Sequence, residues 1–455
     1  MSAAAAAQVP AEWVSVLPHL GYRLPEDRTP QDSQAAQVTV NLPLSLVRQS
    51  ILPTGRWPIP GPVLQGYRRY RPTPLWRARG FEEAIGARVP VYVKYEGGNI
   101  SGSHKLNTAL AQVHYYQAAG VRELATGTGA GQWGTALAAA CGGSGLRCTV
   151  FMVGGSLAAK PYRGSLMRLL GATVIPSPSG LTTVGKRARE QRPGGGLALA
   201  IGEAIEYAAG RQGCAFATGS GETYSIIHQS VIGQEAIAQL QELDADVDTI
   251  IGPVGAGSSF GGTALPFLVH AKTAGLPCPR LLAAESSACP KLTHGVYAFD
   301  HTDATRAGPL EAMYTVGSDY QIPDMHAAGL RYHGAAKLIS AMRYHGQIAA
   351  MAVGQQEALR AGQTFARSEA VLTAPETGHA LAAAARLAAG GLGAGRRSQG
   401  VLVCLSGQGY LDLSAYDEYL AGRLDDAPPS DELIRAATER LQPVHPEQIP
   451  QHAAS

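Results

Sequence analysis

The sequence predicts an α/β protein with two doubly wound domains, and three observations support that class. Short apolar, strand-like runs alternate with helical patterns from about residue 89 to residue 405, with short connections between them. The chain has 455 residues, more than a single typical core accommodates. Glycine-rich turns at 127–134 and 255–259 each follow a strand-like run and open a helical pattern. Together these features favour two sheets with helices on both faces.

The predicted elements fall into four segments. Residues 1–66 form an arm with one helical candidate, 44–51, and with Trp13, Leu17 and Trp57 as apolar anchors. A smaller α/β domain follows at 67–225 and a larger α/β domain at 226–420. A polar, proline-rich tail at 421–455 is expected to be peripheral or partly disordered. The expected strands are 89–95, 123–126, 148–153, 172–175, 249–251, 280–284 and 400–405. The expected helices are 108–119, one opening after Gly134, one containing 167–170, 197–209, 226–240, 260–274, 354–365 and 378–389.

Composition narrows the class of protein. A net charge of +2 gives no electrostatic argument for a nucleic-acid or membrane partner. No window of 18 apolar residues suggests a membrane span, and the first residues lack a signal-peptide pattern. The six cysteines form no C-x-x-C pair, which favours reduced, buried thiols in a cytoplasmic enzyme and predicts no metal site.

The turn at 127–134 contains Gly129-x-Gly131-x-x-Gly134, the spacing of the dinucleotide-binding fingerprint. That fingerprint also needs an acidic residue about 20 positions further on to bind the ribose. No Asp or Glu lies between Glu123 and Glu190. We therefore expect these glycines to bind another anionic group.

Four sites together predict a pyridoxal 5′-phosphate enzyme. Lys105 begins a predicted helix among small residues, where the helix dipole disfavours a cation and conversion to a Schiff base would relieve it. The small residues 255–259 form a phosphate cradle, the loop 128–132 suits a carboxylate, and Ser406 follows the last predicted strand. Each site has a simpler explanation, such as an exposed turn lysine or glycines selected for sterics. A serine facing the pyridine nitrogen would favour loss of a β-substituent over transamination.

The motifs also carry a resemblance to a known family. They resemble the tryptophan synthase β chain, most closely its second type, from near Trp13 to about Leu420. The matching stretches are R-P-T-P-L (71–75), K-Y-E-G (94–97), G-S-H-K (102–105), T-G-A-G-Q-W-G (128–134), K-P-Y-R (160–163), P-S-P-S (176–179), H-Q-S-V-I-G-Q-E (228–235), G-L-R-Y-H-G (329–334), A-P-E-T-G-H-A (374–380) and L-S-G-Q-G (405–409).

The resemblance implies a type II pyridoxal-phosphate fold, with the cofactor between two α/β domains, and it assigns roles to individual residues. Lys105 is similar to the Schiff-base lysine that also moves the α-proton. The implied cofactor contacts are His104, Asn107, Gly255, Ala256, Gly257, Ser258, Ser259, Glu369 near the ring, and Ser406 at its nitrogen. Ala256 and Ser259 depart from the family's phosphate loop. The implied substrate-binding loop is Gly127, Thr128, Gly129, Ala130, Gly131 and Gln132.

Gly127 is the departure with the largest consequence. The family has E-T-G-A-G-Q where this chain has G-T-G-A-G-Q, and that glutamate assists loss of the serine hydroxyl. A positioned acid contributes about 10²–10⁴-fold to rate. We therefore expect β-replacement on L-serine or an activated analogue, through aminoacrylate, to give a non-standard, tryptophan-like amino acid.

Three alternatives stay open. The first is tryptophan synthesis with the acid supplied by Glu96 or Glu369, and the second is chemistry at Cα without elimination. The third is a cofactor-binding subunit with little activity. On the leading hypothesis the partners are an amino-acid donor and a small-molecule nucleophile, and Gly127→Glu raises tryptophan formation. The resemblance favours a homodimer and leaves open both an α-chain partner and a monovalent-cation requirement.

Overall fold

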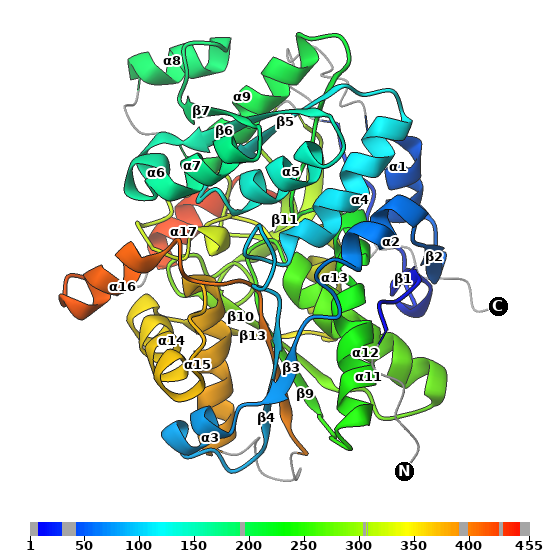
Figure 1. Cartoon of the computed structure of the whole chain (residues 1–455). Coiled ribbons are helices and arrows are strands. Elements are labelled where there is room, and N and C mark those ends of the chain that lie inside the picture. The colour runs from blue at the N-terminus through cyan, green and yellow to red at the C-terminus, as the bar shows by residue number, and fades with distance from the viewer. Residues whose placement is uncertain are drawn as a thin grey trace.

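The protein is described here from a computed structural model that covers residues 8–29, 42–191, 196–303, 306, 308–390, 399–426 and 431–445. Parts of the predicted arm and tail (1–7, 30–41, 427–430 and 446–455) lie outside these residues. Two α/β lobes are stacked in Figure 1, the smaller at the top and the larger below. The fold class predicted from the sequence is confirmed.

The larger lobe is built on a six-stranded sheet. Its strand order is β13-β10-β9-β14-β4-β3, parallel throughout except for β3 at one edge. The strands are β3 (Leu75–Arg77), β4 (Val91–Tyr95), β9 (Thr249–Pro253), β10 (Arg280–Ser286), β13 (Ala349–Val353) and β14 (Val401–Leu405). The central strands are apolar on both faces, as expected for a parallel sheet covered on both sides by helices.

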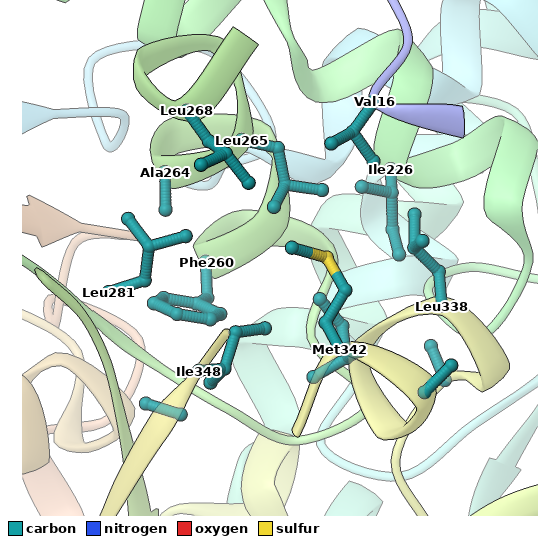
Figure 2. Packing of buried hydrophobic residues seen from close by; sticks show 14 of the residues in the cluster. Val16, Ile226, Phe260, Ala264, Leu265, Leu268, Leu281, Leu338, Met342 and Ile348 are labelled. Atoms are coloured by element: carbon teal, nitrogen blue, oxygen red, sulfur yellow. The ribbon is translucent and has the colours of Figure 1, made fainter. Parts of the chain in front are cut away.

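Alternate residues of these strands enter two separate cores. Ile251 and Leu282 pack with Phe365, whereas Ile250 and Leu281 pack with Phe260 on the other face. Three helices cover the first face: α3 (Arg79–Ile85), α14 (Gln355–Glu369) and α15 (Pro375–Gly390). The second core is formed with α10 (Thr223–Gln229), α11 (Val231–Glu242), α12 (Ser258–Ala274) and α13 (Lys337–Tyr344). Figure 2 shows this second core, with Val16 of the N-terminal arm in it.

The smaller lobe has a four-stranded parallel sheet in the order β7-β6-β5-β8. The strands are β5 (Glu123–Thr128), β6 (Arg147–Val153), β7 (Thr173–Ser177) and β8 (Cys214–Phe216). Its helices are α4 (Lys105–Ala118), α5 (Gln132–Gly142), α6 (Gly154–Ala159), α7 (Pro161–Leu169), α8 (Thr183–Gln191) and α9 (Leu197–Ala209). One face packs against α4 and α5, and the other against α9.

The N-terminal arm is part of the folded body. Strand β1 (Glu12–Val14) pairs with β2 (Arg56–Pro58), and α1 (Leu44–Ile51) and α2 (Gly61–Tyr67) complete the arm after the short helix η1 (Leu17–His19). Trp13 is fully buried, and the centroid of its indole lies 4.4 Å from that of the His228 ring, with the two planes tilted by 45°. The expected anchors Trp13 and Leu17 are therefore confirmed, whereas Trp57 is only partly buried.

Three features differ from the sequence prediction. The expected helix 226–240 is two helices, α10 and α11, that meet at Ser230. Strands β3 and β4 belong to the larger sheet, so the smaller lobe does not begin at residue 67; R-P-T-P-L returns the chain to the larger sheet's edge. An antiparallel hairpin, β11 (Val296–His301) and β12 (Leu310–Thr315), interrupts the expected alternation.

The tail is also more ordered than expected. After α16 (Leu413–Leu420), helix α17 (Asp431–Thr438) buries Ile434 against Tyr320, and β15 (Gln442–Pro443) pairs with β11. A further short helix, η2 (Ala328–Leu330), lies in the cleft between the lobes. No helix in the described ranges has the length and apolarity needed to cross a bilayer. All six cysteines are free thiols, and only Cys278 is exposed.

Candidate active site

The candidate site is a cavity between the two lobes. The main cavity has a volume of about 180 Å³, and a narrower cavity of about 30 Å³ adjoins it. Lys105, Gln132, Ala256 and Gly329 line both, so the two cavities meet at these residues. The smaller lobe contributes α4, β5, α5 and α9, whereas the larger contributes the turn after β9 and strand β12.

Lys105 is the first residue of α4 and lines both cavities. Among the described residues none hydrogen-bonds its ammonium group. Burial lowers the pKa of Lys105 to about 8; nearby Arg163 lowers it as well, while Glu376 acts in the opposite direction. A large fraction of this amine is therefore neutral near pH 8, which is the form that attacks an aldehyde.

The loop before Lys105 is fixed to the end of β14. His104 donates its backbone N–H to the Ser406 carbonyl over 3.0 Å, and its ring Nδ1 lies 3.0 Å from the same oxygen. A bridge between Ser103 and Gly407 extends this pairing. Ser406 Oγ lies 3.1 Å from Thr377 Oγ1 and borders the narrower cavity. Lys105 and Ser406, 301 positions apart in the sequence, are thereby held at one site.

Residues 255–259 form the turn between β9 and α12, and all five border the narrower cavity. Gly257 has φ +118°, in the left-handed region, and a Cβ there would lie 2.7 Å from Ile339. A Cβ on Gly255 would lie 2.1 Å from the Gly329 carbonyl oxygen. His104 Nε2 approaches Ser258 Oγ at 3.3 Å. The turn therefore presents backbone N–H groups at a helix N-terminus, a geometry that suits a phosphate.

The predicted substrate loop runs from the end of β5 into α5. Gly127, Thr128, Gly129, Ala130 and Gln132 line the main cavity. Gly131, at φ +90°, is the residue before the helix and does not line it. The open amides at the start of α5 face the same cavity as Lys105, as a carboxylate site would require.

Gly127 does not enlarge the cavity, because α9 occupies the adjacent space. A Cβ on Gly127 would lie 2.4 Å from the backbone nitrogen of Ile201 and 2.6 Å from the carbonyl carbon of Ala200. The small residues Ala200 and Ala204 let α9 approach the sheet this closely. Leu197, Ile201 and Ile205, one face of α9, line the cavity. An apolar helix face therefore borders the position where the family has a carboxylate.

The structure does not bring Glu369 to the cavity. Both of its oxygens are used at the outer face of the larger sheet, where they accept from Trp76 Nε1 and from the Phe81 backbone N–H, each at 2.9 Å. Among the described residues, the glutamate that borders the narrower cavity is Glu376, in the first turn of α15. It lies within the A-P-E-T-G-H-A motif, so the signal was present in the sequence but was assigned to the wrong residue.

Asn107 also lies outside the cavity, in a buried polar network. Arg71 pairs with Glu96 at 2.8 Å and with Glu235 at 2.8 Å, and Lys94 pairs with Glu235 at 2.9 Å. The Asn107 side-chain oxygen accepts from Arg71 at 3.0 Å. Two residues after Lys105, Asn107 points away from the cavity because successive helical side chains are turned by about 100°. Three of the matched sequence segments thus meet, with Asn107, in one charge-neutral cluster.

Glu96 is no substitute for the missing acid. It is fully buried in that network; burial alone would raise its pKa, but the Arg71 ion pair overrides this and lowers it to about 2. It borders neither cavity. The two residues that the sequence suggested as replacements, Glu96 and Glu369, are therefore both excluded by position.

The residues present fit pyridoxal phosphate. A buried lysine with a lowered pKa, a glycine turn with space only for hydrogen at two positions, and a strand-end serine surround the narrower cavity. The buried oxygens Ser103 Oγ and Glu376 Oε2 have no hydrogen-bond partner among the described residues. Buried polar atoms without partners are costly, so both favour a polar ligand here.

Comparison with known proteins agrees with this chemistry. Residues 67–407 match the family model described as pyridoxal-phosphate dependent enzyme. The chain therefore belongs to the family of pyridoxal-phosphate dependent enzymes, and its cofactor is pyridoxal phosphate. Two solved structures share the fold at low identity. A fungal L-serine ammonia-lyase from Rhizomucor miehei has TM-score 0.58 at 20% identity, over 77% of this chain and 98% of that one. Maize serine racemase has a TM-score of 0.53 at 18% sequence identity, over 80% of this chain and 98% of that one.

Within that family the similar curated proteins are tryptophan synthase β chains. Tryptophan synthase beta chain 2 of Aeropyrum pernix is 41% identical over 432 residues, which is 93% of this chain and 96% of that protein. The tryptophan synthase beta chain of Pyrobaculum islandicum is 45% identical over 401 residues, which is 87% of this chain and 93% of that protein. The chain belongs with the tryptophan synthase β chains, as the motifs predicted, and is a lyase-type β-replacement enzyme.

Proposed function

We propose that the protein replaces the β-substituent of an amino-acid donor with a nucleophile other than indole, giving a non-standard, tryptophan-like amino acid. The observation that carries this proposal is the close approach of α9 to Gly127, at 2.4 Å from an added Cβ. That approach puts an apolar wall where the family places its carboxylate.

The residues of the cleft that the sequence singled out, together with Glu376, have roles in this proposal. The turn 255–259 holds the cofactor phosphate, the loop 128–132 binds the donor carboxylate, and Ser406 Oγ faces the ring nitrogen. Lys105 Nζ anchors the cofactor and then moves the proton at the donor's Cα. The bound cofactor supplies an electron sink for that proton loss. Glu376, whose other oxygen accepts from the Gly329 N–H at 2.8 Å, acts electrostatically on Lys105 and favours its protonated form.

The donor follows from the leaving group. Hydroxide leaves poorly without an acid, and a positioned acid is worth about 10²–10⁴-fold. We therefore expect an O-acylated serine, whose carboxylate leaves without protonation, to be a better donor than L-serine. A screen of donors against nucleophiles, with products identified by mass spectrometry, tests this. O-Acetyl-L-serine is expected to exceed L-serine by at least about 10²-fold in kcat/KM. Equal rates with both donors, or no replacement product from any pair, would contradict the proposal.

A second candidate is tryptophan formation itself. The similar curated proteins carry that name, and identity to them extends over more than 85% of this chain. L-Serine with indole is therefore one arm of the same screen. We also expect a homodimer, from the resemblance, and a cytoplasmic protein, from the composition. An α-chain partner and a monovalent cation are tested by adding each to the assay.

Gly127→Glu is expected to reduce both stability and activity, the reverse of the gain that the sequence alone predicted. Its side chain must displace the backbone of α9 at Ile201, and overpacking of this kind costs about 1–3 kcal/mol or more. Thermal unfolding and the rate of tryptophan formation measure the two effects. Gly129→Ala is the matched control for stability in the same loop, because its Cβ would meet only Leu197, at 3.9 Å. A gain in tryptophan formation by Gly127→Glu would show that α9 moves aside.

A further inference from the structure

Two carboxylates line the main cavity and have no part in the chemistry described above. Glu222 precedes α10, and its side chain makes no capping hydrogen bond to that helix; Glu311 lies on β12. Both keep some accessible surface, as expected for side chains that border a cavity. Within the described part of the chain neither carboxylate accepts a hydrogen bond. They border the same cavity as Lys105 and the substrate loop.

The charges around this pair do not balance. Asp27 of the arm and Lys337 of α13 form an ion pair and act electrostatically on both glutamates. With both glutamates ionised, three carboxylates therefore face one ammonium. Burial raises the pKa of Glu222 and Glu311, that of Glu311 to about 8, and their mutual repulsion adds to the effect at Glu311. Even with one shared proton the group keeps an excess negative charge.

A buried hydroxyl within electrostatic reach of the pair also lacks a partner among the described residues. The Tyr224 side chain is fully buried, and its hydroxyl has no hydrogen-bond partner among the described residues. Burial raises the pKa of Tyr224, and the charges of Glu222 and Glu311 contribute. Tyr332 also borders the cavity, and burial together with the charges of both glutamates raises its pKa. Two carboxylates and the Tyr332 side chain thus border one cavity, and no donor among the described residues hydrogen-bonds either carboxylate.

We propose that Glu222 and Glu311 bind a cationic nitrogen on the nucleophile, so that the incoming group is a flat aromatic ring bearing a protonated amine or amidine. This inference rests on the proposed function, because it assigns this cavity to the nucleophile. The cavity walls suit the ring: Leu197, Ile201 and Ile205 of α9 form an apolar side together with Phe216 and Met313. A cation supplies the donors that the two carboxylates lack and balances their charge. The product would be an amino acid with a basic aromatic side chain.

Benzamidine and benzamide test the proposal directly. They have the same shape, but only benzamidine carries the positive charge. Isothermal titration into the cofactor-loaded enzyme is expected to show benzamidine binding at least about tenfold more tightly, since hydrogen bonds to charged groups contribute roughly 1.5–3 kcal/mol. Its affinity should rise between pH 6 and pH 9, as the pair loses its shared proton, while that of benzamide stays constant.

Variants locate the binding site. In Glu222→Gln/Glu311→Gln the advantage of benzamidine should fall below about threefold, with benzamide binding unchanged. Each single variant should show an intermediate loss, which keeps the test usable if the double variant folds poorly. Glu418→Gln, which removes an exposed partner of Arg423, is the control for net charge and should behave as the unmodified protein does. Correct folding is checked by the cofactor's visible absorbance.

Two results would overturn the inference: equal affinity for the two probes, or a benzamidine advantage that survives in the double variant. Neither depends on turnover. If no donor and nucleophile give a replacement product while the benzamidine contrast holds, the proposed function fails and the cation site stands. If products form but the contrast is absent, the proposed function stands and the cation site fails.

Discussion

Lys105→Ala is expected to lower the β-replacement rate at least about 10³-fold and to abolish covalent attachment of the cofactor. Lys105 borders both cavities, and a positioned proton-transfer group alone contributes about 10²–10⁴-fold. Borohydride reduction followed by mass spectrometry of the peptides measures attachment without any turnover. In the unmodified protein the added mass should appear on the peptide that contains Lys105.

The controls for this prediction use other lysines. Lys186→Ala, on the exposed surface of α8, should retain both the rate and the attachment. The buried Lys291 donates to the Val254 carbonyl, so its ammonium is already engaged. Cofactor mass on any lysine other than 105, or a visible cofactor band that persists in Lys105→Ala, would refute the assignment of the anchoring residue.

Glu235→Gln is expected to destabilise the folded protein by about 3–5 kcal/mol, the largest stability effect among these substitutions. Glu235 pairs with Arg71 and Lys94, and all three side chains are fully buried. Neutralising it leaves two cations with only Glu96 between them, in a medium where an unpaired charge is costly. The midpoint of urea unfolding, followed by tryptophan fluorescence, measures the loss.

A surface pair provides the matched control. Glu12→Gln removes the partner of Arg56, and both of these side chains are largely exposed, so the cost should stay below about 1 kcal/mol. Comparable losses for the two variants would mean that the buried cluster adds nothing beyond an ordinary ion pair. Acid provides a second readout, because the pKa of Glu96 is depressed to about 2. Its contribution is complete above the unfolded-state pKa and disappears as the pH falls towards 2.

Much of the fold could be predicted because its signals are local. Strand and helix periodicity located β5, β6, β9, β14 and α9 to within two residues. The break at Ser230 was missed because apolar spacing continues across it from α10 to α11. The hairpin β11–β12 was missed because its two strands pair directly with each other. No helix separates them, whereas the expected pattern alternates strands with helices.

The site divides in the same way. The motifs placed Lys105, the turn 255–259, the loop 127–132 and Ser406, and the structure brings these to one cleft. The motifs did not predict that Glu369 and Asn107 lie outside the cavity. A motif gives the type of residue but not the direction in which its side chain points. Glu222 and Glu311 belong to no motif, and nothing local marks either as a cavity residue.

The sequence by itself determined the chemistry: a lysine at a helix start, a glycine turn after a strand and a serine at a strand end specify a phosphate-bearing aldehyde cofactor. Each of these three signals depends only on residues a few positions away in the sequence, because the local backbone conformation sets which groups can bind there. Only the tertiary structure carries the proposal about the substrate. The helix that closes on Gly127, and the carboxylates 89 positions apart that meet in the cavity, are set by long-range packing, which no local pattern records.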